Sequence, residues 1–335
     1  MIVITGGGTG GHLRIAKIIK DELNKRGIKP IYIGSTGGQD KEWFENDIGF
    51  EKTLFLNTRG VVNKNIVGKV FHVFNIFKES LKLLLFFRRN KIKKVFSVGG
   101  YSAAPAVFAA IMAKKELYIH EQNAKVGMLN KISKPFCKFF FSSFDDKSVC
   151  KNYPVERSFF ENRRVRKEVK IVLFMGGSLG AKAINKLAME SAEEILKKEI
   201  KIIHITGKKE YEEVKNYYNQ RSLTVECMAF DKEIAKTLAK CDFAISRAGA
   251  SSLFELYASA IPTLFIPYPY AALDHQYYNA NSLVENDMAY CKRESEITRE
   301  YLLEILEKNH SMMSKKLYDA FSNDGAKCIV KHLID

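Results

Sequence analysis

The chain has few residues arranged like a metal centre or a disulfide framework. Its six cysteines are scattered over 335 residues, and none forms a CxxC pair, the spacing expected of zinc ligands or of a redox dithiol. We therefore expect mostly reduced, structural thiols. The six are Cys137, Cys150, Cys227, Cys241, Cys291 and Cys328.

Long uncharged apolar runs are also missing. Met1 is followed directly by a β-prone segment rather than by a basic stretch and an apolar signal core, so we expect a cytoplasmic protein. The segment 64–94 is interrupted by Lys78, Glu79 and Lys82, which excludes a standard transmembrane helix there. The length, with 46% hydrophobic and 27% charged residues, predicts two globular domains.

Acidic residues are outnumbered by basic ones, and the formal net charge is +15. Such an excess favours polyanionic partners, either nucleic acid or an anionic membrane surface. Segment 64–94 has nine Lys and Arg residues and one acid, Glu79, and its apolar residues recur at helical spacing. This pattern is typical of a helix that lies on a membrane, but an ordinary helix with a buried apolar face has it too. Because the charge is not interleaved with exposed aromatics, we expect no nucleic acid partner. The apolar positions are Val67, Val70, Phe74, Phe77, Leu81 and Leu84.

A glycine-rich segment, 6–12, follows the first predicted strand and precedes a predicted helix over 13–25. Bare backbone N–H groups and the positive end of a helix dipole together form an anion site. Gly6, Gly8 and Gly11 also fit the dinucleotide fingerprint GxGxxG, which requires an acid at the end of the next strand. That position carries 34–36, Gly-Ser-Thr, so a bound dinucleotide is not favoured.

Strands alternate with helices along the chain, which predicts right-handed βαβ units and parallel sheets. A polar, basic linker is predicted over 153–168, after which a strand, a glycine turn at 176–180 and a helix recur. The fold class is therefore α/β, with two Rossmann-like doubly wound domains facing a cleft. In the first half, three motifs at strand ends are expected to share one crevice. The predicted strands are 1–5, 28–33, 52–56, 94–98, 116–120, 137–142, 169–175, 200–206, 223–228, 242–246 and 262–266.

Taken in order, the motifs from residue 6 to residue 280 resemble the MurG family of bacterial glycosyltransferases. The resemblance implies a GT-B architecture, with an acceptor and membrane domain at 1–156 and a UDP-sugar domain at 157–335 whose last helix can pack back on the first. It implies inverting transfer of N-acetylglucosamine from UDP-N-acetylglucosamine to lipid I, the undecaprenyl-linked muramoyl-pentapeptide, to make lipid II for peptidoglycan. The motifs are 6–12, 99–101 with Pro105, 120–123 with Gly127 and Asn130, 176–181, 247–255, 274–276 and 279–280.

The resemblance also implies a peripheral enzyme on the cytoplasmic face of the inner membrane, with cell-wall synthesis proteins as partners. His12 is the candidate base, because a helix N-terminus disfavours the imidazolium form, and Glu121 is a second candidate. Glu255 can accept hydrogen bonds from both ribose hydroxyls, and Arg157 is a candidate diphosphate contact. Residues expected on the acceptor side are Gly99, Gly100, Tyr101 and Asn130. Residues expected to bind UDP-N-acetylglucosamine are Thr9, Gly10, Gly11, Asn123, Gly177, Ser178, Phe230, Asp231, Arg247, Ala250, Ser251, Ser252, Leu253, Glu255, His275 and Gln276.

No spaced DxD pair is present, since Asp145 and Asp146 are adjacent. We expect no required cofactor and no protein-bound metal, although Mg²⁺ can screen a diphosphate. Two alternatives stay open. One is another UDP-sugar enzyme of this architecture, such as a diacylglycerol glycosyltransferase or the UDP-N-acetylglucosamine 2-epimerase. The other is a non-catalytic nucleotide-sugar-binding membrane subunit, which would tolerate His12→Ala.

Overall fold

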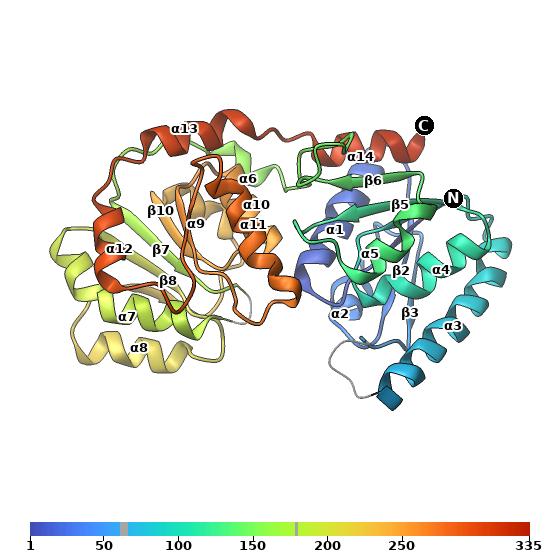
Figure 1. The fold of residues 1–335 in the computed structure, drawn as a ribbon, viewed down its shortest axis with the longest axis horizontal. Helices are drawn as coiled ribbons and strands as arrows, with labels where there is room; N and C mark the ends of the chain where they lie inside the picture. Colours follow the sequence, from blue (N-terminus) through green and yellow to red (C-terminus); the bar gives the residue numbers. More distant parts are fainter. Residues whose placement is uncertain (61–65, 178–179) are drawn as a thin grey trace. The chain divides into compact units, whose positions relative to one another are not determined.

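The computed structural model describes residues 1–60, 66–177 and 180–335, without the side chains of 66–71. It contains two compact units, shown in Figure 1. The first comprises residues 1–154 and 324–335, and the second comprises 155–323. The chain therefore leaves the first unit after Pro154 and returns to it at Asp324, so that the C-terminal helix belongs to the first unit.

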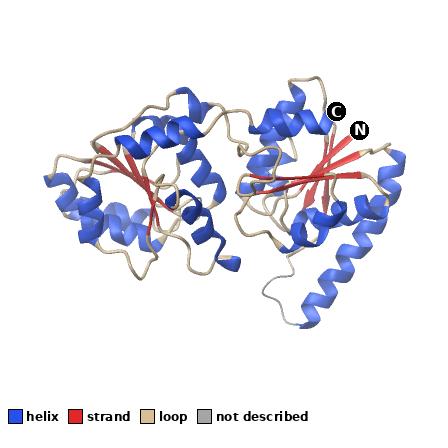
Figure 2. Cartoon of the chain, turned by 45° about the horizontal axis from the view of Figure 1, so that its top comes forward, coloured by secondary structure: helices blue, strands red, loops and turns tan. Residues whose placement is uncertain are grey.

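The first unit is built on a parallel sheet that has six strands in the described residues, in the order β3-β2-β1-β4-β5-β6. Helices lie on both of its faces (Figure 2). The strands are β1 Ile2–Thr5, β2 Ile31–Ser35, β3 Lys52–Leu56, β4 Lys94–Ser97, β5 Glu116–Glu121 and β6 Phe139–Ser142. The helices are α1 Gly10–Asn24, α2 Asp40–Phe44, α3 Ile66–Arg89, α4 Ala104–Met112, α5 Met128–Ser133 and α14 Gly325–Ile334, with short 3₁₀ turns η1 Tyr101–Ala103 and η2 Lys134–Phe136.

The second unit repeats this plan, with a parallel sheet in the order β12-β11-β10-β7-β8-β9. The prediction of two doubly wound α/β domains is confirmed. The strands are β7 Ile171–Met175, β8 Lys201–Ile205, β9 Glu226–Met228, β10 Phe243–Ser246, β11 Thr263–Phe265 and β12 Tyr290–Cys291. The helices are α6 Ser158–Glu161, α7 Lys182–Lys197, α8 Tyr211–Gln220, α9 Ile234–Lys240, α10 Ala250–Ala258, α11 His275–Val284, α12 Arg299–Leu306 and α13 Ser311–Ala320, with a 3₁₀ turn η3 Ala272–Asp274.

Each sheet has one point at which the strand order reverses. In the first sheet β1 pairs with β4, and in the second β7 pairs with β10. Loops that leave two such strands diverge to opposite sides of the sheet and open a crevice at the carboxyl edge, where α/β proteins bind ligands. The loops that follow these four strands are those with the predicted glycine motifs.

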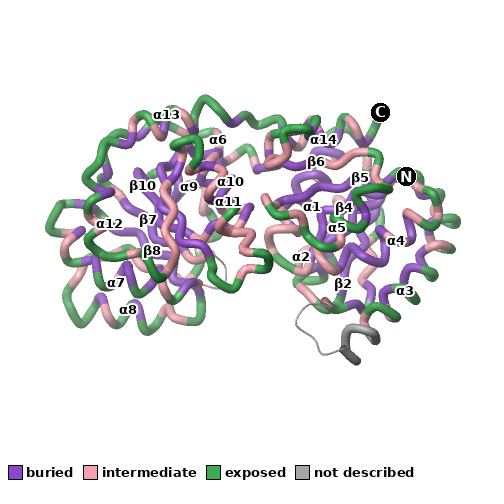
Figure 3. Tube along the Cα trace, viewed as in Figure 1, coloured by how far each residue is buried: buried purple, intermediate pink, exposed green. Residues whose placement is uncertain are grey.

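Helix α3 presents apolar residues on two faces. Ile76, Leu83 and Phe87 are buried, and α3 packs against α4. Phe74 and Phe77, which the sequence pattern placed on the apolar face, are instead 67% and 53% exposed, and the tube in Figure 3 shows α3 with exposed stretches along its length. The helix therefore covers the sheet with one face and leaves a second apolar face uncovered. Of segment 64–94, Lys64 lies outside the described residues, as do the side chains of Val67, Lys69 and Val70.

Two cysteines are not free thiols. Cys150 and Cys328, which are 178 residues apart in sequence, are joined by a disulfide. The expectation of reduced cysteines is wrong for this pair, because its partners come from distant segments and leave no local spacing to recognise. The other four, Cys137, Cys227, Cys241 and Cys291, are free.

Each unit buries a histidine in its sheet. In the second unit His204 lies between the Tyr218 hydroxyl and the Asn185 side-chain oxygen, each 2.9 Å from a ring nitrogen. Burial lowers the pKa of His204 to about 3. In the first unit burial, followed by the charge of His12, lowers the pKa of His120 to about 3. Both rings are therefore neutral in the folded protein at neutral pH.

Because the pKa values of His120 and His204 are lowered, we expect the protein to lose stability in mild acid. Their folded-state pKa lies below the unfolded value of about 6.5. Their contribution to the free energy of unfolding is therefore complete above that pH and falls as the pH drops toward about 3. Each should remove up to about 1.4 kcal/mol per pH unit from the free energy of unfolding. Urea unfolding between pH 7 and 4 measures this slope. His204→Gln should make it shallower, and an unchanged slope would contradict the assignment.

Candidate functional site

Two glycine loops interlock at the reversal point of the first sheet. The loop after β1 contains Gly6 with φ +114°, and the loop after β4 contains Gly100 with φ +79°, both unfavourable for residues with a side chain. A Cβ atom on Gly100 would lie 2.5 Å from the Gly7 carbonyl oxygen, so the loops approach too closely for any other residue. One on Gly99 would lie 3.4 Å from His12 Nε2 and 3.2 Å from Asn130 Nδ2. The fold thus brings His12 to the predicted acceptor residues.

His12 is held by hydrogen bonds on both sides of its ring. Nδ1 lies 2.9 Å from Thr9 Oγ1, and Nε2 lies 2.9 Å from the Gln122 side-chain nitrogen. The direction of these two hydrogen bonds depends on the tautomer of the ring. Thr9 is the N-cap residue of α1, so the ring stands at the start of a helix. With its proton on Nδ1, the ring has a lone pair on Nε2 that could take a proton from a bound hydroxyl.

Glu121, the second candidate base, has its carboxylate oxygens occupied. Oε1 accepts from Asn123 N at 3.0 Å, and Oε2 accepts from Gly127 N and Asn130 Nδ2, both at 2.9 Å. The residue is 3% exposed. Three N–H donors compete with any substrate proton, so this carboxylate is suited to hold the 121–130 loop rather than to act as a base.

A pocket of about 390 Å³ lies beside this loop, at the carboxyl ends of β5 and β6. Its lining includes the polar residues Asn123 and Ser142 and the aromatic residues Phe140 and Phe144. The pocket therefore combines hydrogen-bonding and apolar surface next to the acceptor residues. Its remaining lining residues are Ala124, Val126, Asp145, Asp146 and Lys147.

The second unit places an open helix start at its own reversal point. Gly249 is the N-cap residue of α10, and among the described residues no atom lies within 4 Å of a Cβ built there. Across the reversal point, Gly177 has φ +79°, and a Cβ built on it is equally clear of the parts of the chain that the structure describes. An uncapped helix N-terminus beside an open glycine turn suits a diphosphate. Ser178 lies outside the described residues.

Several predicted donor residues follow in α10. Ala250 is the first residue of the helix, Ser251 and Ser252 are half-buried in its first turn, and Glu255 is buried one turn further on. Leu253 differs, because its side chain is fully buried and its N–H donates to the Gly249 carbonyl. We therefore expect Leu253 to shape the site from the core without touching a ligand.

Polar residues fix the loop between β11 and α11. The Arg247 guanidinium donates to the Ile266 carbonyl at 3.0 Å and forms an ion pair with Glu294. Gln276 Oε1 accepts from Tyr268 N at 3.0 Å. His275 Nδ1 donates to the Ala272 carbonyl at 2.8 Å. These three predicted ligand residues hold the loop that borders the helix start.

Phe230 and Asp231 follow β9. Phe230 is 52% exposed, which leaves its ring available for stacking. Asp231 accepts from Glu233 N at 2.7 Å and from Thr237 Oγ1 at 2.6 Å. Its carboxylate thus holds the turn that leads into α9, and Phe230 is the member of the pair that is open to a ligand.

Arg157 lies at the other end of the unit. It precedes α6, where it pairs with Glu161 at 3.3 Å and is 82% exposed. The neighbouring Phe159 carbonyl accepts from Ser259 Oγ, at the carboxyl end of α10. Because α10 has nine residues, a length of about 13 Å, the second unit by itself does not bring Arg157 to the helix start.

Both halves of the chain match one family. Residues 2–142 match the glycosyltransferase family 28 N-terminal domain, and residues 171–333 match the glycosyltransferase family 28 C-terminal domain. The chain belongs to glycosyltransferase family 28. The resemblance drawn from the motifs is confirmed.

Individual relatives agree with the family assignment. A Wolinella succinogenes protein named UDP-N-acetylglucosamine--N-acetylmuramyl-(pentapeptide) pyrophosphoryl-undecaprenol N-acetylglucosamine transferase is 49% identical over 94% of this chain and 94% of its own. The crystal structure of Acinetobacter baumannii MurG matches with a TM-score of 0.80 at 24% identity, covering 99% of each chain. The UDP-GlcNAc 2-epimerase from Neisseria meningitidis matches at 0.64 and 12% identity, covering 100% of each. The two structural matches show the GT-B fold.

A buried carboxylate that no sequence motif of this family 28 chain indicates holds the first glycine loop in place. Asp40, at the start of α2, is fully buried. Its Oδ2 accepts from Gly8 N at 2.7 Å, and its Oδ1 accepts from Ser35 N at 3.0 Å. The Tyr32 hydroxyl lies 3.1 Å from the same Oδ1 and 2.9 Å from the Gly6 carbonyl oxygen. One buried carboxylate thus joins the ends of β1 and β2.

Removal of this carboxylate should loosen the loop that presents His12. Asp40→Ala leaves the Gly8 and Ser35 N–H groups buried without an acceptor, which should lower the free energy of unfolding by about 2–4 kcal/mol. Glu42→Ala, at an exposed position on the same helix, is the matched control and should cost less than about 0.5 kcal/mol. Urea unfolding compares them, and equal effects would show that the carboxylate is not structural.

Proposed function

We propose that this chain transfers N-acetylglucosamine from UDP-N-acetylglucosamine to undecaprenyl-diphospho-muramoyl-pentapeptide, the step that makes lipid II for peptidoglycan. The near-full-length 49% identity to a transferase named for these substrates carries the proposal. The geometry supports it, because the first unit holds His12 against Gln122, whose neighbour Asn123 lines a pocket, and the second unit has an open helix start suited to an anion. The epimerase matches at only 12% identity.

In this reaction His12 acts as the base. Its Nε2 takes the proton from the muramoyl 4-hydroxyl as that oxygen attacks the anomeric carbon of the donor. The bond from that carbon to the UDP oxygen breaks on the opposite face, so the configuration inverts. The leaving diphosphate carries the new negative charge, which the N-terminus of α10 and the turn at Gly177 are placed to stabilise. The hydroxyl displaces the Gln122 amide from Nε2.

The remaining donor contacts are part of the same proposal. Glu255 receives the ribose hydroxyls and Phe230 stacks beside the uracil ring, whereas Arg247 and Gln276 keep their loop in place. No cofactor enters this scheme. Mg²⁺, if present, would screen the diphosphate as part of the donor and would need no ligand from the protein.

A transfer assay with labelled UDP-N-acetylglucosamine and a lipid I analogue tests the proposal. Loss of the general base in His12→Ala should lower kcat by about 10²–10⁴-fold. The affinity for UDP should change little, because most of the expected donor residues lie in the other unit. The exceptions are Thr9, Gly10, Gly11 and Asn123. Equilibrium UDP binding and the thermal unfolding midpoint serve as the controls for folding.

Three outcomes decide between the alternatives. A folded wild-type protein that transfers no sugar to lipid I would overturn the proposed reaction. Epimerisation of the donor without an acceptor would favour the epimerase. Transfer of the sugar to diacylglycerol would favour a glycolipid glycosyltransferase. Full activity of His12→Ala would remove only the assignment of the base.

The exposed face of α3 is the proposed membrane contact. Phe74, Phe77 and Leu81 follow one another at helical spacing and are exposed, so they cannot serve as core. Lysine and arginine side chains flank them. A surface that is both apolar and basic fits an anionic bilayer, into which the rings insert while the basic groups meet the lipid headgroups. The flanking basic residues include Lys78, Lys82, Arg88 and Arg89.

This contact implies a peripheral protein on the cytoplasmic face of the inner membrane, where a lipid-linked acceptor would be reached. None of the helices in the described parts of the chain is long and apolar enough to cross a bilayer. Cell-wall synthesis proteins remain partners that the family resemblance predicts.

Vesicle co-sedimentation tests the α3 surface. Each basic residue near an anionic surface contributes about 1 kcal/mol, so serine at positions 78, 82, 88 and 89 should weaken binding to phosphatidylglycerol vesicles by at least about a hundredfold. Phe74→Ser with Phe77→Ser should also release the protein. Serine at the exposed Lys197, Lys236, Lys308 and Lys315 of the second unit is the control for total charge. Unchanged vesicle binding of the α3 variants would contradict the proposal that this face contacts the membrane.

A further inference from the structure

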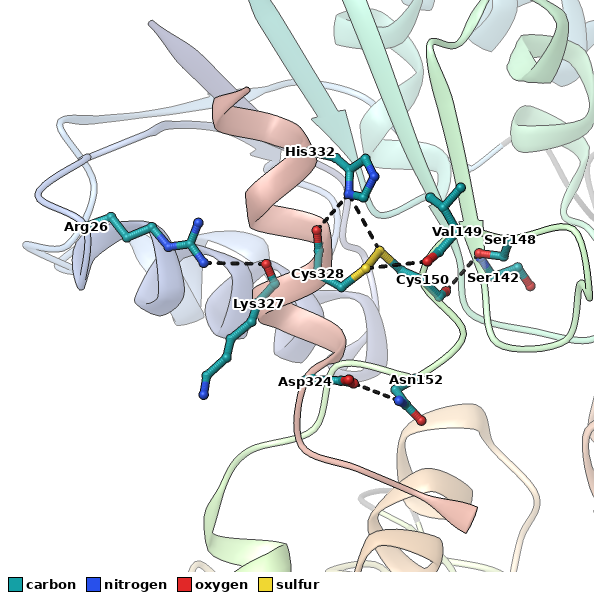
Figure 4. The surroundings of a disulfide bond; sticks show 10 residues. All are labelled: Arg26, Ser142, Ser148, Val149, Cys150, Asn152, Asp324, Lys327, Cys328 and His332. Carbon is teal, nitrogen blue, oxygen red and sulfur yellow. Dashed lines mark hydrogen bonds between the residues drawn. A yellow bond between two sulfur atoms is a disulfide. The ribbon is translucent and has the colours of Figure 1, made fainter.

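A cluster of two cysteines and a histidine lies outside the proposed site. Cys150 follows β6, whereas Cys328 and His332 are one turn apart on α14. Figure 4 shows the disulfide between the two sulfurs with the His332 ring beside it. Each of these residues offers a ligand-type atom within 4.8 Å of the other two. Nothing in the transfer chemistry uses them.

The cluster lies where the chain leaves and re-enters the first unit. Cys150 precedes the crossing after Pro154 by a few residues, and Cys328 follows the return at Asp324 equally closely. The Asn152 side-chain nitrogen donates to Asp324 Oδ1 at 2.7 Å (Figure 4). The disulfide therefore closes a covalent ring that contains the whole second unit.

Non-covalent contacts also hold α14 in place. Ile329, Val330 and Leu333 are buried, and the helix packs against α1. Arg26, which follows α1, donates to the Lys327 carbonyl at 3.5 Å. The helix can therefore stay attached when the disulfide opens, so the bond is free to act as a reversible fastening rather than as the sole support of the fold.

We propose that Cys150 and Cys328 form a reversible thiol–disulfide site that fastens α14 at the two chain crossings and opens and closes with the thiol redox state. Cytosolic thiols are kept reduced, and disulfides in cytosolic proteins are therefore usually transient. The reactants are low-molecular-weight thiols and their disulfides, of which glutathione is the test compound. The inference does not depend on the proposed sugar transfer.

The two sulfurs differ in their surroundings. Cys150 is 4% exposed, whereas Cys328 is half-buried, so Cys328 is the sulfur that a solvent thiolate can reach. His332 Nδ1 donates to the Cys328 carbonyl at 2.9 Å and lies 3.9 Å from Cys150 Sγ. The ring is fixed by the Phe139 ring, with centroids 4.7 Å apart. Its N–H can stabilise a thiolate on Cys150, which makes Cys150 the leaving group.

The exchange then balances in two steps. An external thiolate attacks Cys328 Sγ, the protein S–S bond breaks, and its electron pair leaves on Cys150, which is protonated from solvent. A second thiolate attacks the external sulfur of the mixed disulfide and releases Cys328. In sum, the protein disulfide and two thiols give the protein dithiol and one external disulfide. Oxidation reverses both steps.

Titration of the full-length protein in mixtures of reduced and oxidised glutathione tests the site. Differential alkylation and peptide mass spectrometry should find the Cys150–Cys328 linkage rising and falling reversibly with the glutathione ratio. Amide hydrogen exchange of 325–334 should become at least about tenfold faster on reduction. Cys137→Ser keeps both responses, whereas Cys150→Ser abolishes them. His332→Phe retains the linkage but is reduced several-fold more slowly.

Three results would overturn the inference. Complete alkylation of both thiols at every glutathione ratio would show that no bond forms. A linkage that reduces only after unfolding would show a static disulfide. One tightly held Zn²⁺ per reduced chain, lost in Cys328→Ser, would show that the cluster is a metal site. If a serine variant fails to fold, the wild-type titration decides alone.

Discussion

The pairing of β1 with β4, and of β7 with β10, determines where chemistry can occur in each unit. Parallel pairing brings the carboxyl ends of neighbouring strands to one edge, and reversal of the strand order opens that edge to a ligand. The glycine motifs are therefore useful only because of their place in the sheet. In the first unit this place joins His12 to Gly99 and Asn130. In the second it joins Gly177 to the start of α10.

The two glycine turns are alike in sequence but differ in their surroundings. In the first, the Gly8 N–H already donates to the buried carboxylate of Asp40, and a fixed negative charge beside the loop disfavours a second anion. In the second, Gly177 and Gly249 have open surroundings. This contrast gives a physical reason for placing the diphosphate of the donor in the second unit and the base in the first.

Much of the fold follows from local pattern, because buried parallel strands are apolar runs that end at glycine or small polar residues. The strand predicted at 52–56 has the same bounds as β3. Strand β12 was not predicted, because its two residues are too few to show a pattern of apolar and polar positions. The predicted linker 153–168 has a buried basic residue: Arg166 is 1% exposed and donates to the Cys241 and Ser259 carbonyls. The charge of an arginine suggests that it is exposed. A sequence does not show which backbone carbonyls of a distant segment would accept hydrogen bonds from its guanidinium.

The candidate site was harder to predict than the fold. His12 and Glu121 were both candidate bases, and only the structure separates a ring nitrogen beside one side-chain amide from a carboxylate that accepts from three N–H donors. Asp40, Gln122 and the Cys150–Cys328 pair depend on contacts between distant segments, which no spacing reveals.

Amide hydrogen exchange with and without UDP tests the central claim, that the two glycine turns have different roles. We expect bound UDP to slow amide exchange at 176–182 and 249–253, with no comparable change at 6–12. Protection confined to 6–12 would contradict it and would place the nucleotide in the first unit.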